Sequence, residues 1–456
     1  MNTDKSILRE RTNSLKDLTQ KNMIFLVLLL AVGLIIRIYV SSNYPLWNDE
    51  AITANAALGL LETGSPVFPS GAEYWRAIPY TISVSAAAFI FGSSDILLRS
   101  PSLLFSTISI ITTYLLGKEL YDSQTGMIAA TILSFSLWHI AWSTQVRAYI
   151  LFQVLYLATI LCIYRFEEHK TWFNISILTL LAIFAILTHK TAYILPFVFF
   201  TYLIFNDLYF KNLKHSIILT GIALVSISAF FLVAPTNLSD LMAQLSYQQL
   251  NFKTYYSYLF TKIPLLLFLS GIGIVIGLKE NIKESFLLGV SIIPASIIII
   301  FFVDGVASRY LFFALPIIAL LTGFTIQKTA IKLNQKITSN KFNVGQLIAL
   351  ITTLLVLFGL FHTSITDFRP DSPDKLIYDT LNDEAYEEDI VITQWTPVLT
   401  YYYRPPDYAL YADEDSIFSD VMQDHNYRGI EMYSGAEFLN SSSSFNEVIR
   451  NNSRGW

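Results

Sequence analysis

Two adjacent carboxylates, Asp49 and Glu50, lie where the chain leaves its first long apolar segment. They follow the stretch Tyr44-Pro45-Leu46-Trp47-Asn48 and precede an amphipathic run over residues 51–61. An acidic side chain at a membrane surface can accept a proton or hold a cation. Because only 14% of the chain is charged, few other residues could do this chemistry. Asp49 and Glu50 are therefore the predicted catalytic residues.

The composition is that of a membrane protein that crosses the bilayer many times. The 456 residues are 53% hydrophobic and only 14% charged. A soluble globular protein carries about 25% charged residues. The single cysteine, Cys162, lies inside an apolar run and excludes an intrachain disulfide or a cysteine metal cluster. The sequence contains no glycine-rich phosphate-binding loop. We therefore expect no nucleotide-sugar donor. No nucleic-acid partner is predicted either.

Eleven apolar runs are long enough to cross a bilayer. They lie at about 23–41, 100–117, 126–143, 149–165, 172–188, 192–206, 215–234, 261–278, 285–303, 309–327 and 344–363. A further run, 77–93, is shorter and less apolar. If it does not span and the N-terminus is cytoplasmic, the cytoplasmic segments hold more than twice as many Lys and Arg residues as the external loops. If it spans, the bias reverses, so the sequence predicts eleven spans with 77–93 at the external surface.

This topology predicts an integral membrane protein of the cell membrane with three parts. Residues 1–22 form a cytoplasmic segment, 23–363 the transmembrane domain with its first external loop at 42–98, and 364–456 an external α/β domain. In the last part, Asp389–Thr393 is a predicted strand, and Pro373–Leu381 and Pro397–Tyr403 are predicted helices. The polar tail 440–456 is expected to be mobile.

The same topology gathers isolated charges on the external face of the membrane. They are Asp49, Glu50, Glu62, Glu73, Arg76, Arg99, Arg147, His189, Lys190, Asp304 and Arg309. Arg and Lys can bind a lipid phosphate and stabilise the charge that develops as it leaves. A carboxylate can take the proton of an attacking hydroxyl. Both groups at one surface suit group transfer from a lipid phosphate.

Several short motifs, in order, resemble the GT-C superfamily of membrane glycosyltransferases. The likeness is to the branch of the protein O-mannosyltransferases and aminoarabinose transferases (glycosyltransferase family 39). The motifs are Asp49-Glu50, Tyr74-Trp75-Arg76, Pro79-Tyr80, Phe91-Gly92-Ser93-Ser94, Leu98-Arg99-Ser100-Pro101-Ser102, Leu116-Gly117-Lys118-Glu119-Leu120, Arg147-Ala148-Tyr149, Thr188-His189 and Arg309-Tyr310 ahead of Pro316.

The resemblance implies a GT-C fold with juxtamembrane helices after the first span. It also implies that Asp49 activates the acceptor and that Arg76 lies near the lipid phosphate. Relatives often carry a second acidic residue where this chain has Gln145-Val146-Arg147, which leaves that role unassigned. Asp49 and Glu50 could hold a divalent cation, but the relatives by motif act without one, so no cofactor is expected.

Each candidate also has a purely structural interpretation. Asp49 and Glu50 could serve as acidic residues at a helix N-terminus, and Arg76 could snorkel at the interface. Arg99 fits an interface anchor better than a functional residue. The remaining predicted substrate-binding residues could either anchor their spans or contact a headgroup phosphate; they are Arg147 with Tyr149, the pair His189-Lys190, and Arg309.

The sequence thus predicts an inverting transferase that moves a monosaccharide from dolichyl or undecaprenyl phosphate to an external glycan, glycolipid or protein. The alternative is a flippase or transporter of lipid-linked sugars, which would place charges inside its spans and show pseudo-symmetric halves. A third interpretation is an oligosaccharyltransferase or polymer ligase.

Overall fold

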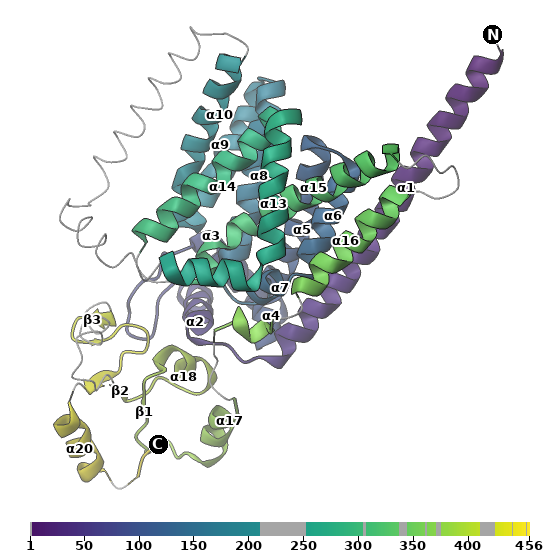
Figure 1. Ribbon diagram of the computed structural model, residues 1–456. Coiled ribbons are helices and arrows are strands. Elements are labelled where there is room, and N and C mark those ends of the chain that lie inside the picture. Colours follow the sequence, from purple (N-terminus) through teal and green to yellow (C-terminus); the bar gives the residue numbers. More distant parts are fainter. Residues whose placement is uncertain are drawn as a thin grey trace. The chain divides into compact units, whose positions relative to one another are not determined.

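The computed structural model describes residues 2–209, 252–303, 307–336, 344–360, 363–370, 375–410, 425–439, 441–452 and 454–456, with side chains from residue 22 (Figure 1). Its contacts divide the chain into two units. The first unit comprises Met1–Arg37, Phe105–Trp142 and Phe152–Phe368. The second comprises Ile38–Leu104, Ser143–Leu151 and Arg369–Trp456. The predicted domain boundaries at 22 and 363 stay a prediction.

Six stretches of helix in the described residues are long and apolar enough to cross a membrane. They are Asn22–Asn43 of α1 (Asn2–Asn43), Asp95–Leu120 with α4 (Asp95–Leu98) and α5 (Ser100–Leu120), α8 (Tyr149–Glu168), Lys190–Tyr209 with η1 (Lys190–Ile194) and α10 (Leu195–Tyr209), Ile282–Phe301 of α14 (Ile282–Phe302), and Ser308–Lys336 with η2 (Ser308–Ala314) and α15 (Leu315–Lys336).

Two bent helix pairs raise the number of possible spans to eight. One pair is α6 (Ser123–Phe135) and α7 (Leu137–Ser143), with a bend of 66°. The other joins Phe252–Lys262 to α13 (Pro264–Glu280), with a bend of 95°. Three apolar helices are shorter: α3 (Ile78–Phe91), α9 (Trp172–Thr188) and α16 (Val344–Leu360). The predicted run 215–234 lies outside the described residues, so eleven spans remain a prediction.

Helix α15 is the buried centre of the first unit and packs against α6, α13 and α16. In the most apolar window of the stretch Ser308–Lys336, which contains α15, 89% of the residues are buried, as is typical of a helix segment that is apolar all round. Small residues permit neighbouring helices of this unit to approach one another closely. A Cβ on Gly126 of α6 would lie 2.4 Å from the carbonyl oxygen of Tyr114 in α5, and one on Gly323 would lie 2.8 Å from the carbonyl oxygen of Thr125.

The second unit contains α2 (Asn48–Thr63), which packs against α3 and α18 (Thr396–Tyr402). A parallel sheet with strand order β1-β2-β5 joins Ile392–Thr393, Tyr408–Leu410 and Glu437–Leu439. Strands β3 (Asn426–Tyr427) and β4 (Ile430–Glu431) form an antiparallel pair. The helices predicted near residues 373–381 and 397–403 are present as α17 (Lys375–Glu384) and α18, and the predicted strand is present as the shorter β1.

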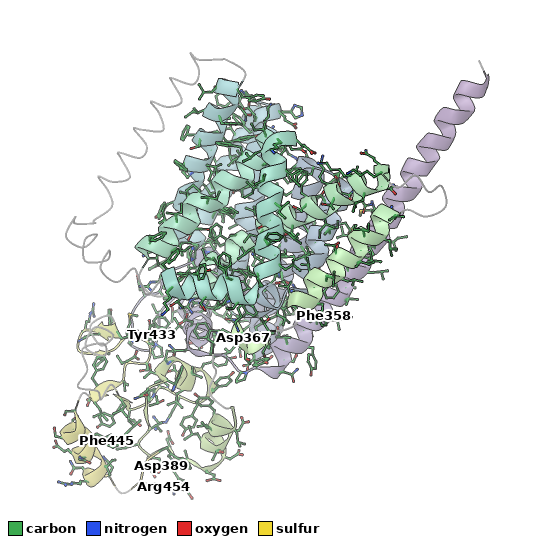
Figure 2. All side chains as sticks on the ribbon, viewed as in Figure 1. Phe358, Asp367, Asp389, Tyr433, Phe445 and Arg454 are labelled. Atoms are coloured by element: carbon green, nitrogen blue, oxygen red, sulfur yellow. The ribbon has the colours of Figure 1, made fainter. Side chains whose placement is uncertain are left out.

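The end of the chain differs from the expectation of a mobile tail. Residues Ser442–Asn451 form helix α20, and the side chain of Ser441 caps its N-terminus. Beyond it, Arg454 Nε lies 3.0 Å from Asp389 Oδ2 (Figure 2). The backbone N–H of Trp456 donates to the carbonyl of Ile390 at 2.9 Å. These contacts hold the last residues beside the sheet, which the polar composition of the tail did not indicate.

Candidate functional site

The carboxylate of Glu50, in the first turn of α2, is fully buried and saturated with hydrogen bonds. Its Oε1 accepts from Arg99 Nε at 2.9 Å and from the backbone N–H of Val146 at 2.7 Å. Its Oε2 accepts from Arg99 Nη2 at 2.8 Å, from Arg369 Nη2 at 3.0 Å and from the backbone N–H of Trp47 at 3.4 Å. Since each oxygen already accepts at least two hydrogens, this carboxylate has little capacity to accept another.

Two guanidinium groups keep Glu50 ionised although it is buried. Burial acts to raise its pKa, but the charges of Arg99 and Arg369 outweigh burial and hold the pKa below its usual value. Burial lowers the pKa of Arg369 to about 10, so this group still carries its charge at neutral pH. The Arg369 guanidinium also lies 4.8 Å from the ring centroid of Tyr44.

Sequence reasoning misplaced Arg99 and overlooked Arg369. Arg99 was expected to anchor a span at the interface, yet its side chain is completely buried beside Glu50. Besides Glu50, it donates to the backbone carbonyls of Ser41, Tyr44 and Pro45. Arg369 is 319 residues from Glu50 in the sequence, and no local pattern marks a partner at that separation.

Asp49 is the neighbour of Glu50 on α2, but its side chain is in a different environment. Successive helical residues point about 100° apart, and 23% of the Asp49 side chain is exposed. Its Oδ2 lies 3.3 Å from Arg147 Nη2. Arg147 Nη1 also donates to the Asp49 carbonyl at 2.9 Å and to Thr53 Oγ1 at 3.1 Å. Asp49 is therefore oriented by one cation and remains accessible to solvent.

Arg147 is held in its charged form by the groups around it. Burial acts to lower its pKa, but the charge of Asp49, followed by Tyr74 and Tyr149, raises the pKa above its usual value. The Arg147 guanidinium lies 5.7 Å from the ring centroid of the buried Tyr149. The structure thus brings Asp49, Arg147 and Tyr149 together, and their role as a site stays a prediction.

The segment Gln145-Val146-Arg147 fastens the start of α2 rather than supplying a second acid. Gln145 Oε1 accepts from Trp47 Nε1 at 2.8 Å, and its carbonyl accepts from Ser102 Oγ at 2.5 Å. The next two residues contact Glu50 and Asp49, as described above. One short loop therefore fixes both acidic residues.

Arg76 belongs to the same unit but is exposed and makes no ion pair with any described residue. Ala77, directly after it, has the left-handed backbone conformation (φ 51°) and caps α3. This conformation is unfavourable for a residue with a Cβ, and it fixes the direction in which the chain approaches α3.

The other three predicted residues belong to the first unit. His189 precedes η1, its ring stacks on Phe152 with centroids 4.8 Å apart, and its Nδ1 accepts the backbone N–H of Thr191. Lys190 is exposed. The guanidinium of Arg309, in η2, lies 5.9 Å from the Trp142 ring centroid and 5.4 Å from that of Tyr310.

Comparisons with known proteins support the resemblance found in the sequence. A family model described as dolichyl-phosphate-mannose-protein mannosyltransferase matches residues 77–235, about a third of the chain. A structure of ArnT from Cupriavidus metallidurans bound to undecaprenyl phosphate is similar with a TM-score of 0.58 at 13% identity, over 93% of this chain and 91% of that one. No curated protein matches significantly.

Archaeal oligosaccharyltransferases are also similar in structure. AglB from Archaeoglobus fulgidus, in complex with an inhibitory peptide and a dolichol-phosphate, matches at 13% identity with a TM-score of 0.56, over 84% of this chain and 64% of that one. The oligosaccharyltransferase of the same organism with Zn and sulfate matches over 60% of its length. This chain thus spans less than two thirds of the archaeal proteins.

The fold is that of the GT-C membrane glycosyltransferases. The described residues contain no group of three or more His, Cys, Asp or Glu side chains placed to hold a metal ion, and Asp304 lies outside them. What the site offers is one accessible carboxylate beside an arginine and one carboxylate buried between two arginines. The first can exchange a proton with a bound hydroxyl; the second is suited to hold the surrounding backbone.

Proposed function

We propose that this chain transfers a monosaccharide from a polyprenyl-phosphate donor to a glycan, glycolipid or protein on the external face of the membrane. The matching family model supports this proposal through its description as a dolichyl-phosphate-mannose transferase. Two proteins of similar fold have structures with undecaprenyl phosphate and dolichol-phosphate.

The observation that carries the mechanism is the contrast between Asp49 and Glu50. Asp49 is partly exposed, and Arg147 at 3.3 Å orients it. We assign Asp49 as the general base. The acceptor oxygen attacks the anomeric carbon and its proton passes to Asp49. The bond from that carbon to the phosphate oxygen breaks, and its electron pair leaves with the polyprenyl phosphate. A single displacement of this kind inverts the anomeric centre.

Glu50, predicted as catalytic, fits a positioning role better in this proposal. Its oxygens are occupied by two arginines and two backbone N–H groups. It would hold the loop at Val146 against the start of α2 and so keep Asp49 in place.

The charge on the departing phosphate requires cations. In the second unit we assign this role to Arg76 and Arg147, with Tyr149 packing beside Arg147. In the first unit the residues proposed for phosphate binding are His189, Lys190 and Arg309. Arg76 is the exposed member of this set within the second unit, so its five N–H donors are open to an incoming phosphate. Arg147 would stabilise the charge of the phosphate from a position next to Asp49, since it already contacts that carboxylate.

The test is the Asp49→Asn variant in reconstituted full-length protein. We expect turnover with polyprenyl-phosphate monosaccharides to fall about 10²–10⁴-fold, because the general base is lost. Binding of undecaprenyl phosphate should stay near the wild-type value. Glu62→Gln is the matched control, because it removes the same charge from an exposed position of the same helix. A fully active Asp49→Asn enzyme would refute the assignment of Asp49 as the general base.

A flippase or transporter of lipid-linked sugars is the second candidate, because one observation favours it. Arg37 is a fully buried charged residue inside the candidate span Asn22–Asn43. Buried charges within spans often mark transport pathways. Movement of lipid-linked sugar across reconstituted vesicles without sugar transfer would favour this alternative.

A further inference from the structure

Arg37 lies within the candidate span Asn22–Asn43 and is completely buried. A charged side chain at such a depth is costly unless it is fully paired. Its Nη1 donates to the carbonyl of Gly33 at 2.9 Å and to that of Ser134 at 3.0 Å. Its Nη2 donates to the carbonyl of Leu133 at 3.3 Å and lies 2.8 Å from His139 Nδ1. All of these residues belong to the first unit.

These contacts coincide with the break between α6 and α7. Helix α6 ends at Phe135, Ser136 is extended (φ −65°, ψ 119°), and the axis turns by 66°. The last carbonyls of a helix lack N–H partners within it, and hydrocarbon offers no water to replace them. Arg37 supplies donors to two of these carbonyls, at Leu133 and Ser134. Its positive charge also suits the negative end of the helix dipole.

The hydrogen bonds continue beyond Arg37 in one direction. A guanidinium can only donate, so His139 Nδ1 must accept and the ring proton lies on Nε2. That Nε2 is 3.0 Å from Gln153 Oε1, which also accepts from Ser109 Oγ at 2.7 Å. Gln153 Nε2 then donates to the carbonyl of Phe312 at 2.8 Å. The side chains of His139, Gln153 and Ser109 are buried.

The chain of hydrogen bonds ends on a backbone carbonyl, which has no proton to pass on. A proton pathway or transport relay would need a titratable or mobile group at that end. A fixed, fully satisfied network instead makes a structure rigid and unique. The arrangement is thus suited to hold the segment in which it ends.

That segment is η2, which carries Arg309. A 3₁₀-helix has poor hydrogen-bond geometry and needs support from its surroundings. Gln153 holds η2 at Phe312. At the other end, Trp142 Nε1 of α7 donates to Ser308 Oγ at 3.1 Å, and the Arg309 guanidinium lies over the Trp142 ring. The helix α7 that presents Trp142 also carries His139.

We propose that Arg37, His139 and Gln153 form a positioning relay that fixes the broken helix α6–α7 and η2, and thereby the guanidinium of Arg309. None of the three touches the substrate in this proposal. The relay itself stands on the geometry of the first unit. Only its consequence for donor binding rests on the proposed function, through the assignment of Arg309 to the phosphate.

The test uses Gln153→Leu in the full-length protein in lipid nanodiscs. This change removes the donor to Phe312 and the acceptor for His139. We expect amide hydrogen exchange in residues 308–314 to rise about 10-fold or more, while exchange in α13 stays unchanged. Tyr156→Phe is the matched control on the same helix, because it removes a buried hydrogen bond to the Ser291 carbonyl and keeps the ring.

A double-mutant cycle separates positioning from a general loss of structure. Gln153→Leu should weaken binding of undecaprenyl phosphate about 10-fold, and it should add nothing in an Arg309→Ala background. Unchanged exchange in residues 308–314, or equal losses of affinity in both backgrounds, would overturn the relay. If Gln153→Leu fails to fold, Ser109→Ala removes one bond to Gln153 and should shift the same segment less. Wild-type protein that binds no polyprenyl phosphate would refute the proposed function, while the exchange data still decide the relay.

Discussion

Replacing Glu50 by Gln removes one negative charge and almost no volume from the point where two arginines meet. Four donor groups converge on the carboxylate: the guanidiniums of Arg99 and Arg369 and the backbone N–H groups of Val146 and Trp47. Glutamine keeps one acceptor oxygen and adds an NH₂ group. Whichever way the amide turns, its NH₂ faces at least two of these donors, so hydrogen bonds are lost as well as charge.

The expected cost follows from burial. The side chains of Glu50 and Arg99 are 0% exposed and that of Arg369 is 1% exposed, so solvent does not screen the uncompensated cations. Removing one partner of a buried ion pair costs about 3–5 kcal/mol. Because total stabilities are only about 5–15 kcal/mol, Glu50→Gln should lose a large share of the folding free energy.

Thermal unfolding of the full chain in detergent measures this loss. At about 2 °C per kcal/mol, the melting temperature of Glu50→Gln should fall by about 6–10 °C. Asp49→Asn is the matched control, since its partly exposed ion pair contributes less than about 1 kcal/mol. Adding Arg369→Met to Glu50→Gln removes one surplus cation and should recover part of the stability. A Glu50→Gln melting temperature within about 2 °C of that of Asp49→Asn would refute the reasoning.

Three further predictions concern stability. Two arginines hold the pKa of Glu50 below its unfolded value despite its burial. Its contribution to the free energy of unfolding is therefore complete above about pH 4.3 and is lost as the pH falls through the folded pKa. The melting temperatures of wild type and Glu50→Gln should converge in acid. Gly126→Ala should destabilise by about 1–3 kcal/mol, because its Cβ would lie 2.4 Å from a backbone carbonyl oxygen, whereas Gly271→Ala, where the Cβ meets open space, should be neutral or stabilising in the same assay. Tyr402→Phe should lose about 1–3 kcal/mol, because this hydroxyl donates to Asp95 at 2.6 Å and accepts a backbone N–H; a melting temperature equal to wild type would contradict its role.

Local patterns were enough to find several parts of this protein. The apolar runs predicted the candidate spans, because a helix that crosses a bilayer needs about 20 apolar residues. The amphipathic run after Asp49-Glu50 indicated the helix that the structure has as α2. Pro397 and the tyrosines after it indicated the short helix α18.

The sequence favoured Asp49 over Glu50 as the base, but it could not show that the two adjacent carboxylates lie in different environments. Their difference comes from Arg99 and Arg369, which approach Glu50 from 49 and 319 residues away. It could not place Arg37 either, because an arginine in an apolar run looks like an interface residue until its partners at 133, 134 and 139 are known.

The sequence by itself therefore determined the class of the protein, its apolar segments and the short list of groups able to do chemistry. Hydrophobicity and local motifs are properties of neighbouring residues, so they can be read along the chain. Only the tertiary structure decided which carboxylate is buried among arginines and which one is accessible. The difference between the two carboxylates comes from ion pairs that form away from water. The free energy of such a pair depends on residues that are distant in the sequence, so it cannot be read from local patterns.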